Sequence, residues 1–185
     1  MVGNGKSKTA VKTRYMVMTA FMAVIMVICS WITIPMVVPF TLQTFAVFFA
    51  LLFLGGTYGT LSIFIYILLG IIGIPVFSGF KSGLAVITGP TGGYIVGFLF
   101  SGLIFIIMTR LFGEKKAVLI ISMVLGLLIC YLIGTLWFMH VYAGTESAKS
   151  FGTVLSICVI PFIIPDICKM VLAYIMSGLV KKAVR

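Results

Sequence analysis

The segment Gly73–Tyr94 reads GIPVFSGFKSGLAVITGPTGGY and separates two apolar stretches that are long enough to cross a bilayer. It cannot form a regular helix, because Pro75 and Pro90 lack a backbone donor and its glycines lower helix stability. In a strongly apolar chain, irregular backbone is tolerated only where protein buries it or where it lines a cavity. Three rings and one hydroxyl in the segment suit a small polar ligand: Phe77, Phe80, Tyr94 and Thr91. We therefore expect a binding site here.

The composition indicates an all-α, polytopic integral membrane protein. Of the 185 residues, 62% are hydrophobic and only 9% are charged. In a typical soluble domain, about a quarter of the residues are charged. The apolar runs are continuous rather than alternating in polarity, which argues against an outer-membrane barrel. No Ser/Pro-rich or charged linker divides the chain, so we expect one compact bundle.

Six transmembrane helices can be drawn along the chain. We predict them at Tyr15–Ile34, Thr41–Leu54, Thr60–Ile74, Gly93–Leu111, Ala117–Met139 and Phe151–Val180. The second and third are short for a hydrocarbon core that needs about 20 residues, so one interrupted membrane segment is the alternative. The glycines of Gly55–Gly59 favour two helices joined by a turn. The predicted organisation is a polar cytoplasmic segment at 1–14, a transmembrane domain at 15–182 and a tail at 183–185.

The basic residues agree with six helices and with both termini in the cytoplasm. Only Lys81 and Lys149 would lie outside, as the positive-inside rule favours. The residues that would lie inside are Lys6, Lys8, Lys12, Arg14, Arg110, Lys115, Lys116, Lys181, Lys182 and Arg185. The net charge of +10 is gathered at the ends of the helices and not in a stripe, so we expect no nucleic-acid partner. On this topology the Gly/Pro-rich loop between helices 3 and 4 is extracellular, with Trp31 and Trp137 at outer helix ends.

Small residues predict close helix contacts. They recur every four residues at Gly93, Gly97 and Ser101, and again at Gly126, Cys130 and Gly134. Such faces let helix backbones approach each other in a membrane. We favour packing inside the bundle over an oligomer interface.

Asp166 and Lys169 form the only charged pair within an apolar run of the sequence. Their spacing of three residues places them on one helix face, in the outer half of the membrane. A structural ion pair would explain why they are adjacent, but charged residues inside a membrane are expensive and commonly functional. We therefore favour ligand binding. Pro161 and Pro165 precede the pair, and Pro165 either breaks the helix or begins it.

Other polar residues give weaker indications. The Gln43 amide can donate and accept hydrogen bonds, so it either contacts a urea-like or amide-like ligand or caps nearby backbone. His140 has only Glu146 near it in the sequence and is interpreted as an interfacial residue, as is Tyr142. With three acidic residues in the chain, we expect no catalytic residues and no metal site.

Four segments together resemble the BioY family, the biotin-binding S components of energy-coupling factor (ECF) vitamin transporters. They are PFTLQTFAVFFALLFLGGTYG at Pro39–Gly59, YILLGIIGIPVFSG at Tyr66–Gly79, GPTGGYIVGF at Gly89–Phe98 and PDICK at Pro165–Lys169. The resemblance extends from about Ala20 to the last helix. It implies a multi-pass protein of a prokaryotic plasma membrane that captures biotin from outside.

The resemblance also implies partners and a site. The partners are a transmembrane coupling protein and two ATPases, so ATP is used only by these subunits and the chain needs no cofactor of its own. The family offers an Ala-x-x-x-Ala face on its first helix, for which this chain has Thr19, Ala20 and Ala23. For biotin, Asp166 would accept from a ureido N–H, and Lys169 would donate to the ureido oxygen or to the carboxylate. The remaining contacts would come from Gln43, Phe77, Gly79, Gly83, Gly89, Thr91, Gly92, Gly93 and Tyr94.

Three alternatives remain at this stage. The chain is an S component for a different vitamin, a stand-alone biotin transporter, or a membrane-embedded enzyme. An enzyme would need acid and base groups close together, and the acid and base candidates, His140, Glu146 and Asp166, are scattered in the sequence.

Overall fold

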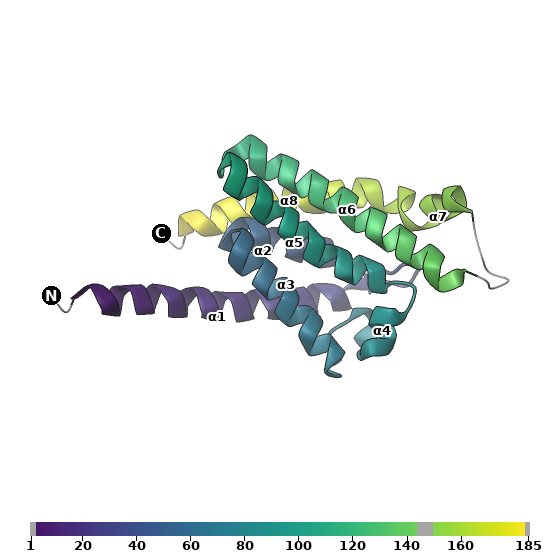
Figure 1. The fold of residues 1–185 in the computed structure, drawn as a ribbon, viewed down its shortest axis with the longest axis horizontal. Coiled ribbons are helices and arrows are strands. Elements are labelled where there is room, and N and C mark those ends of the chain that lie inside the picture. The colour runs from purple at the N-terminus through teal and green to yellow at the C-terminus, as the bar shows by residue number, and fades with distance from the viewer. Residues whose placement is uncertain (1–2, 144–149, 184–185) are drawn as a thin grey trace.

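A computed structural model describes residues 3–143 and 150–183 of the chain. Within these residues the fold is all-helical apart from one two-stranded hairpin (Figure 1). The eight α-helices of the described part are α1 Gly3–Trp31, α2 Gln43–Leu54, α3 Gly56–Ile71, α4 Leu84–Thr88, α5 Gly92–Phe112, α6 Lys116–Tyr142, α7 Phe151–Cys158 and α8 Ile160–Ala183. The predictions for Glu146, Lys149 and Arg185 lie outside the described residues.

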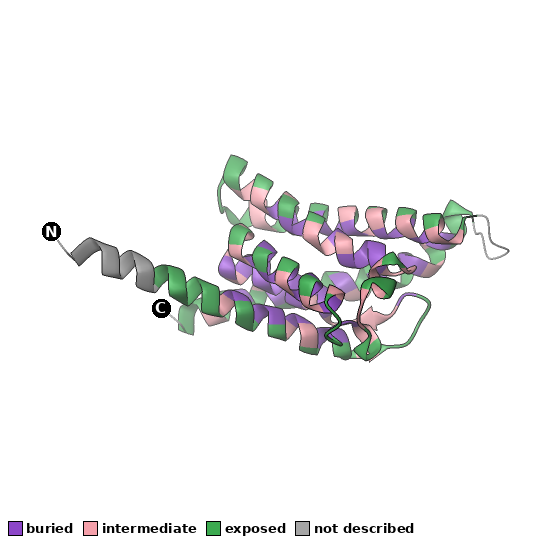
Figure 2. Ribbon diagram, turned by 60° about the horizontal axis from the view of Figure 1, so that its bottom comes forward, coloured by how far each residue is buried: buried purple, intermediate pink, exposed green. Residues whose placement is uncertain are grey.

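Four of these helices are long and apolar enough to span a membrane. They are Val11–Trp31 within α1, α5, Lys116–Val141 within α6, and α8, while α2 and α3 are shorter apolar helices. Large apolar side chains cover the outer faces of the bundle, and the buried residues lie between the helices (Figure 2). An apolar exterior around a buried core is the arrangement that a lipid environment requires. The chain is therefore a multi-pass membrane protein.

The first predicted helix is wrong at both ends. α1 begins at Gly3, because the Lys, Ala and Arg residues of the polar segment are good helix formers, and it ends at Trp31. Thr33–Ile34 forms strand β1, which pairs antiparallel with β2 at Phe40–Thr41. Ile34 precedes Pro35, and a residue before proline avoids the helical conformation. The outer end of α1 therefore leads into a hairpin that crosses the end of the bundle.

The second and third helices are separate, as predicted, but the turn between them is shorter than Gly55–Gly59. Only Gly55 is non-helical, with a φ of 83°, and α3 begins at Gly56. A Cβ added at Gly59 would lie 2.7 Å from the Cα of Leu51, so the glycine lets the two helices pack against each other.

The sixth predicted helix is two helices. α7 ends at Cys158, Val159 is non-helical, and α8 begins at Ile160. Pro161 lies in the first turn of α8, where its missing N–H costs nothing. Pro165 lies inside α8, so it neither begins the helix nor ends it.

The segment Gly73–Tyr94 is mostly irregular, as predicted, but it contains local structure. A short 3-10 turn, η1, spans Ser78–Phe80, and α4 adds one helical turn before α5. Both chain ends lie at one end of the bundle, and α4 and α7 lie at the other end (Figure 1).

The small residues predicted to make close contacts do so between α5 and α6. A Cβ added at Gly97 would lie 2.9 Å from the Cα of Cys130, and the Ser101 hydroxyl donates to the Gly126 carbonyl at 2.5 Å. These faces are used for packing inside the bundle. They hold together the two helices that carry Tyr94 and Tyr131.

Candidate ligand-binding site

A cavity of about 290 Å³ opens at the end of the bundle that carries α4 and α7. Its walls come from the β1–β2 hairpin, the start of α2, the Gly73–Tyr94 loop, and helices α5, α6 and α8. These elements are far apart in the sequence, so only the packed bundle creates the cavity. Of the predicted site residues, six line it: Gln43, Phe77, Thr91, Tyr94, Asp166 and Lys169.

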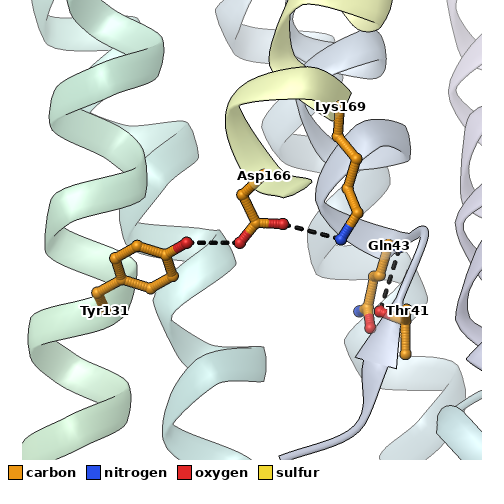
Figure 3. A network of polar contacts seen from close by, with 5 residues as sticks. All are labelled: Thr41, Gln43, Tyr131, Asp166 and Lys169. Atoms are coloured by element: carbon orange, nitrogen blue, oxygen red, sulfur yellow. Dashed lines mark hydrogen bonds and ion pairs between the residues drawn. The ribbon is translucent and has the colours of Figure 1, made fainter. Parts of the chain in front are cut away.

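Asp166 and Lys169 form a buried ion pair on the cavity wall. The Lys169 Nζ donates to Asp166 Oδ1 at 2.8 Å, and the residues are only 4% and 6% exposed. The Tyr131 hydroxyl donates to the other carboxylate oxygen, Oδ2, at 2.6 Å, so Asp166 lies between the two donors (Figure 3). An ionised carboxylate offers about four acceptor positions. Asp166 therefore keeps capacity for a ligand donor while its charge is compensated.

The β1–β2 hairpin covers the ammonium group of Lys169. Its Nζ lies 4.0 Å from the centroid of the Phe40 ring, and Phe40 in turn stacks on Phe162 of α8 at 6.1 Å. A cation over an aromatic face gains about 0.5–2 kcal/mol, with the larger values for desolvated pairs. Lys169 is thus held by a carboxylate and a ring, and its position is fixed before any ligand arrives.

Two buried polar atoms on the cavity wall lack a hydrogen-bond partner. They are Nε2 of Gln43 and the hydroxyl of Tyr94. The buried hydroxyl of Tyr66 likewise lacks a hydrogen-bond partner. Leaving a buried polar group unsatisfied costs about 1–3 kcal/mol. A polar ligand in the cavity could remove this cost.

The loop over the cavity is anchored by two tryptophans. The Trp31 indole donates to the Pro75 carbonyl at 2.9 Å, and the Trp137 indole donates to the Gly89 carbonyl at 3.1 Å. The Ser30 hydroxyl also donates to the Val76 carbonyl at 2.5 Å. Helix-end tryptophans usually mark the membrane interface. Here they also fix both ends of the loop.

Phe77 anchors the loop from within. It is 1% exposed, packs edge-on against Tyr66 at 5.6 Å, and fills the space that a side chain at position 70 would need. Phe80, by contrast, packs on Trp31 at 4.8 Å and is not on the cavity wall. Only one of these two predicted rings is therefore available to a ligand.

Five predicted glycines are not on the cavity wall. Gly79 and Gly83 have φ values of 71° and 86°, which L-residues rarely adopt. Gly89, Gly92 and Gly93 are required by packing: added Cβ atoms would meet the Ala85 carbonyl, the Ile87 carbonyl and the Trp137 side chain. Backbone conformation and helix packing thus account for these glycines, and their contact with a ligand stays a prediction.

The predicted docking residues divide between the inside and the outside of the bundle. Thr19 is 1% exposed and Ala23 is 2% exposed, whereas Ala20 is on the surface. The packed core therefore covers two of the three residues, and in this conformation only Ala20 can touch a partner. The physical reason is that residues 19 and 23 share a helix face, whereas residue 20 lies about 100° away.

Several wall residues were missed by the sequence reasoning. Tyr131 is the most important, and its signal was a tyrosine in mid-helix, whose hydroxyl needs a partner when it is buried. Lys81 also lines the cavity, although its position in the sequence indicated only the membrane topology. Among the described residues, no three His, Cys, Asp or Glu side chains come together as metal ligands. His140 is not on the cavity wall, whereas Tyr142 is.

The chain is similar to known proteins over most of its length. The model of the BioY family matches residues 5–185. A biotin transporter BioY from Thermotoga maritima is 38% identical over 91% of this chain and 96% of the relative. A probable biotin transporter BioY from Pyrococcus horikoshii is 44% identical over 76% of this chain and 78% of the relative.

A solved structure is similar over nearly the whole length. It is the crystal structure of the S-component for biotin from an ECF-type ABC transporter, which is 29% identical to this chain. The two superpose with a TM-score of 0.79, covering 98% of this chain and 95% of that one.

Proposed function

The chain belongs to the BioY family, and from this premise we propose that it captures biotin outside the cell as the S component of an ECF transporter. The observation that carries the proposal is the buried group of Asp166, Lys169 and Tyr131 on the cavity wall. Burying charged side chains in a membrane protein costs free energy, and such groups usually mark a functional site. A cavity with few convergent polar groups and apolar walls suits a small ligand.

The chemistry of the biotin head matches these groups. The ureido ring has two N–H donors and one carbonyl acceptor, and Asp166 retains acceptor capacity beside Lys169 and Tyr131. Nε2 of Gln43 is a buried donor that needs an acceptor, which the ureido carbonyl provides. Phe77 and Tyr94 supply apolar surface for the bicyclic ring, and Thr91 a further hydroxyl. We assign the ureido ring to this part of the cavity.

In the membrane, we propose six crossings with both termini in the cytoplasm. The crossings are α1, α2, α3, α5, α6 and the α7–α8 unit, with the transmembrane domain at 15–182 and the cavity facing outside. Arg14, Glu114 and Lys181 line a second cavity near Gly55, so the basic residues Arg14 of α1 and Lys181 of α8 lie at the same end of the bundle. This clustering supports a single cytoplasmic face.

The chain binds and delivers its substrate without an ATPase or a cofactor of its own. The energy comes from a coupling protein and two ATPases, as the S component in the similar structure belongs to an ECF-type ABC transporter. Exposed apolar residues of α1, including Ala20, offer a surface in the membrane for the coupling protein. Release of biotin into the cytoplasm would require this partner.

The test is biotin binding by the purified protein and by its Asp166→Asn variant. The change keeps the size of the side chain but removes the charge that pairs with Lys169, so we expect biotin affinity to fall about 100-fold, as for a hydrogen bond to a charged group. Isothermal titration calorimetry in detergent measures it. Glu114→Gln, at the opposite end of the bundle, is the matched control and should bind like the unmodified chain.

Three outcomes would contradict the proposal. Preference for another vitamin in a panel containing riboflavin, thiamine and biotin would assign the chain to a different S-component specificity. Unchanged biotin affinity in Asp166→Asn would remove Asp166 from the site. Biotin uptake into vesicles that contain only this chain would instead identify a stand-alone transporter.

A further inference from the structure

We propose that Lys81 binds the carboxylate of the biotin tail, so that the ureido ring points into the bundle and the tail points toward the mouth of the cavity. This inference rests on the proposed function and decides between two orientations of the ligand. Lys81, Asp166 and Lys169 are the charged residues on the described cavity wall, and Lys81 alone of these is exposed. The carboxylate of the ligand pairs with whichever of the two cations, Lys81 or Lys169, is free to meet an anion.

Lys169 is already compensated. Its ammonium group lies 2.8 Å from Asp166 Oδ1 and 4.0 Å from the centroid of the Phe40 ring. A ligand carboxylate placed beside Lys169 would also lie close to the Asp166 carboxylate, and like charges at short range repel strongly in a buried site. The polar but overall neutral ureido ring meets no such repulsion. Asp166 and Lys169 therefore favour the head of biotin over its tail.

Lys81 has no such compensation within the described residues. The acidic residues in that part of the chain are Glu114 and Asp166. Glu114 lines the cavity at the other end of the bundle, and Asp166 pairs with Lys169. Lys81 therefore presents a cation to the mouth of the cavity, where an anion arriving from outside meets it first.

The loop holds Lys81 at this position. Its carbonyl accepts from the Phe77 N–H at 3.0 Å, which closes the turn around η1. Phe77 is fixed in the core and is itself on the cavity wall. The Ser78 hydroxyl donates to the Thr33 hydroxyl at 2.9 Å, which ties the same turn to the β1–β2 hairpin. Lys81 thus extends from an anchored turn that closes the outer side of the cavity.

The cavity also has apolar wall surface that suits a hydrocarbon chain. Val86, Ile95 and Phe98 contribute apolar surface to the cavity. A valerate tail can pass along such surface without losing hydrogen bonds, whereas a carboxylate cannot. The cavity therefore offers polar groups for the head, apolar groups for the tail and a cation for its end.

The experiment compares biotin with biotinamide, which has the same head and tail but no negative charge. Lys81→Gln should lower biotin affinity about tenfold, mainly through slower association, and should leave biotinamide affinity within about twofold, because a rim charge acts mostly on the association rate. Lys81→Arg should retain biotin affinity. Lys116→Gln, which removes an exposed charge at the start of α6, is the matched control.

The two proposals fail in different ways. Equal affinity of Lys81→Gln and the unmodified chain for biotin would overturn the role of Lys81, as would an equal loss for biotin and biotinamide. Asp166→Asn should lose both ligands. If the unmodified chain binds neither ligand, the proposed function itself is wrong, whatever Lys81 does. Retained biotinamide binding in Lys81→Gln shows that this variant is folded.

Discussion

At the scale of residues, the central feature is a buried carboxylate that accepts hydrogen bonds from two side chains. Asp166 accepts a hydrogen bond from Lys169 on one carboxylate oxygen and from Tyr131 on the other. The pair alone could have been a structural ion pair, since burial is tolerated when charges are compensated. The cavity beside the pair and the unsatisfied Gln43 amide make a binding role the better explanation.

The hydroxyl of Tyr131 should matter for this arrangement. Tyr131→Phe removes the donor to Asp166 Oδ2 and leaves a buried carboxylate oxygen without that partner, which costs about 1 kcal/mol or slightly more. We expect biotin and biotinamide affinity to fall together by about three- to tenfold in calorimetric titrations. Tyr58→Phe, on a ring that stacks on Tyr15 away from the cavity, is the control. Unchanged affinity in Tyr131→Phe would mean that Lys169 alone positions Asp166.

At the scale of elements, the packing of α5 against α6 determines the site. Tyr94 and Tyr131 reach the cavity from these two helices, whose backbones approach closely at Gly97 and Cys130. Van der Waals packing at small residues is a main source of helix association in lipid. The loop between α3 and α5 then takes its position from Trp31 and Trp137 at neighbouring helix ends.

A single methyl group should test that packing. Gly97→Ala would place a Cβ 2.9 Å from the Cα and Sγ of Cys130, so the helices must separate, at a cost of about 1–3 kcal/mol. Gly178→Ala is the matched control, because no atom lies within 4 Å of its added Cβ. Thermal unfolding in detergent should show a lower Tm for Gly97→Ala only. Equal Tm values would show that α5 and α6 can move apart freely.

At the scale of the whole molecule, the two ends of the bundle differ in the residues that they carry. The ligand cavity lies at one end, and the chain termini lie at the other together with Arg14, Glu114 and Lys181 (Figure 1). Basic residues at one end favour its retention in the cytoplasm. The sidedness that we propose rests on this charge distribution and is independent of the details of the cavity.

Cysteine labelling in intact cells should reveal this sidedness. In a background in which Cys29, Cys130, Cys158 and Cys168 are replaced, Lys81→Cys should react with a membrane-impermeant maleimide. Lys116→Cys should react only after the cells are permeabilised, because six crossings place it inside. Labelling of both positions in intact cells would contradict six crossings.

The sequence by itself determined the class of protein, most helices and the Asp166–Lys169 pair on the cavity wall, whose contact with a ligand stays a prediction. Continuous apolar runs and the distribution of Lys and Arg are local properties, so they predict membrane helices without any tertiary contact. The Asp166–Lys169 pair was also local, because a spacing of three residues on a helix brings side chains together.

Tertiary structure decided what depends on contacts between distant segments. Tyr131 meets Asp166 across 35 positions in the chain, and Lys81 reaches the same cavity from the loop. No local pattern encodes either arrangement. Several glycines of Gly73–Tyr94 were predicted to contact the ligand. Backbone conformation and packing give each of them a structural role, and their contact with a ligand stays a prediction. The sequence predicted that this loop belongs to a binding site, and the packing of the bundle determined which of its residues line the cavity.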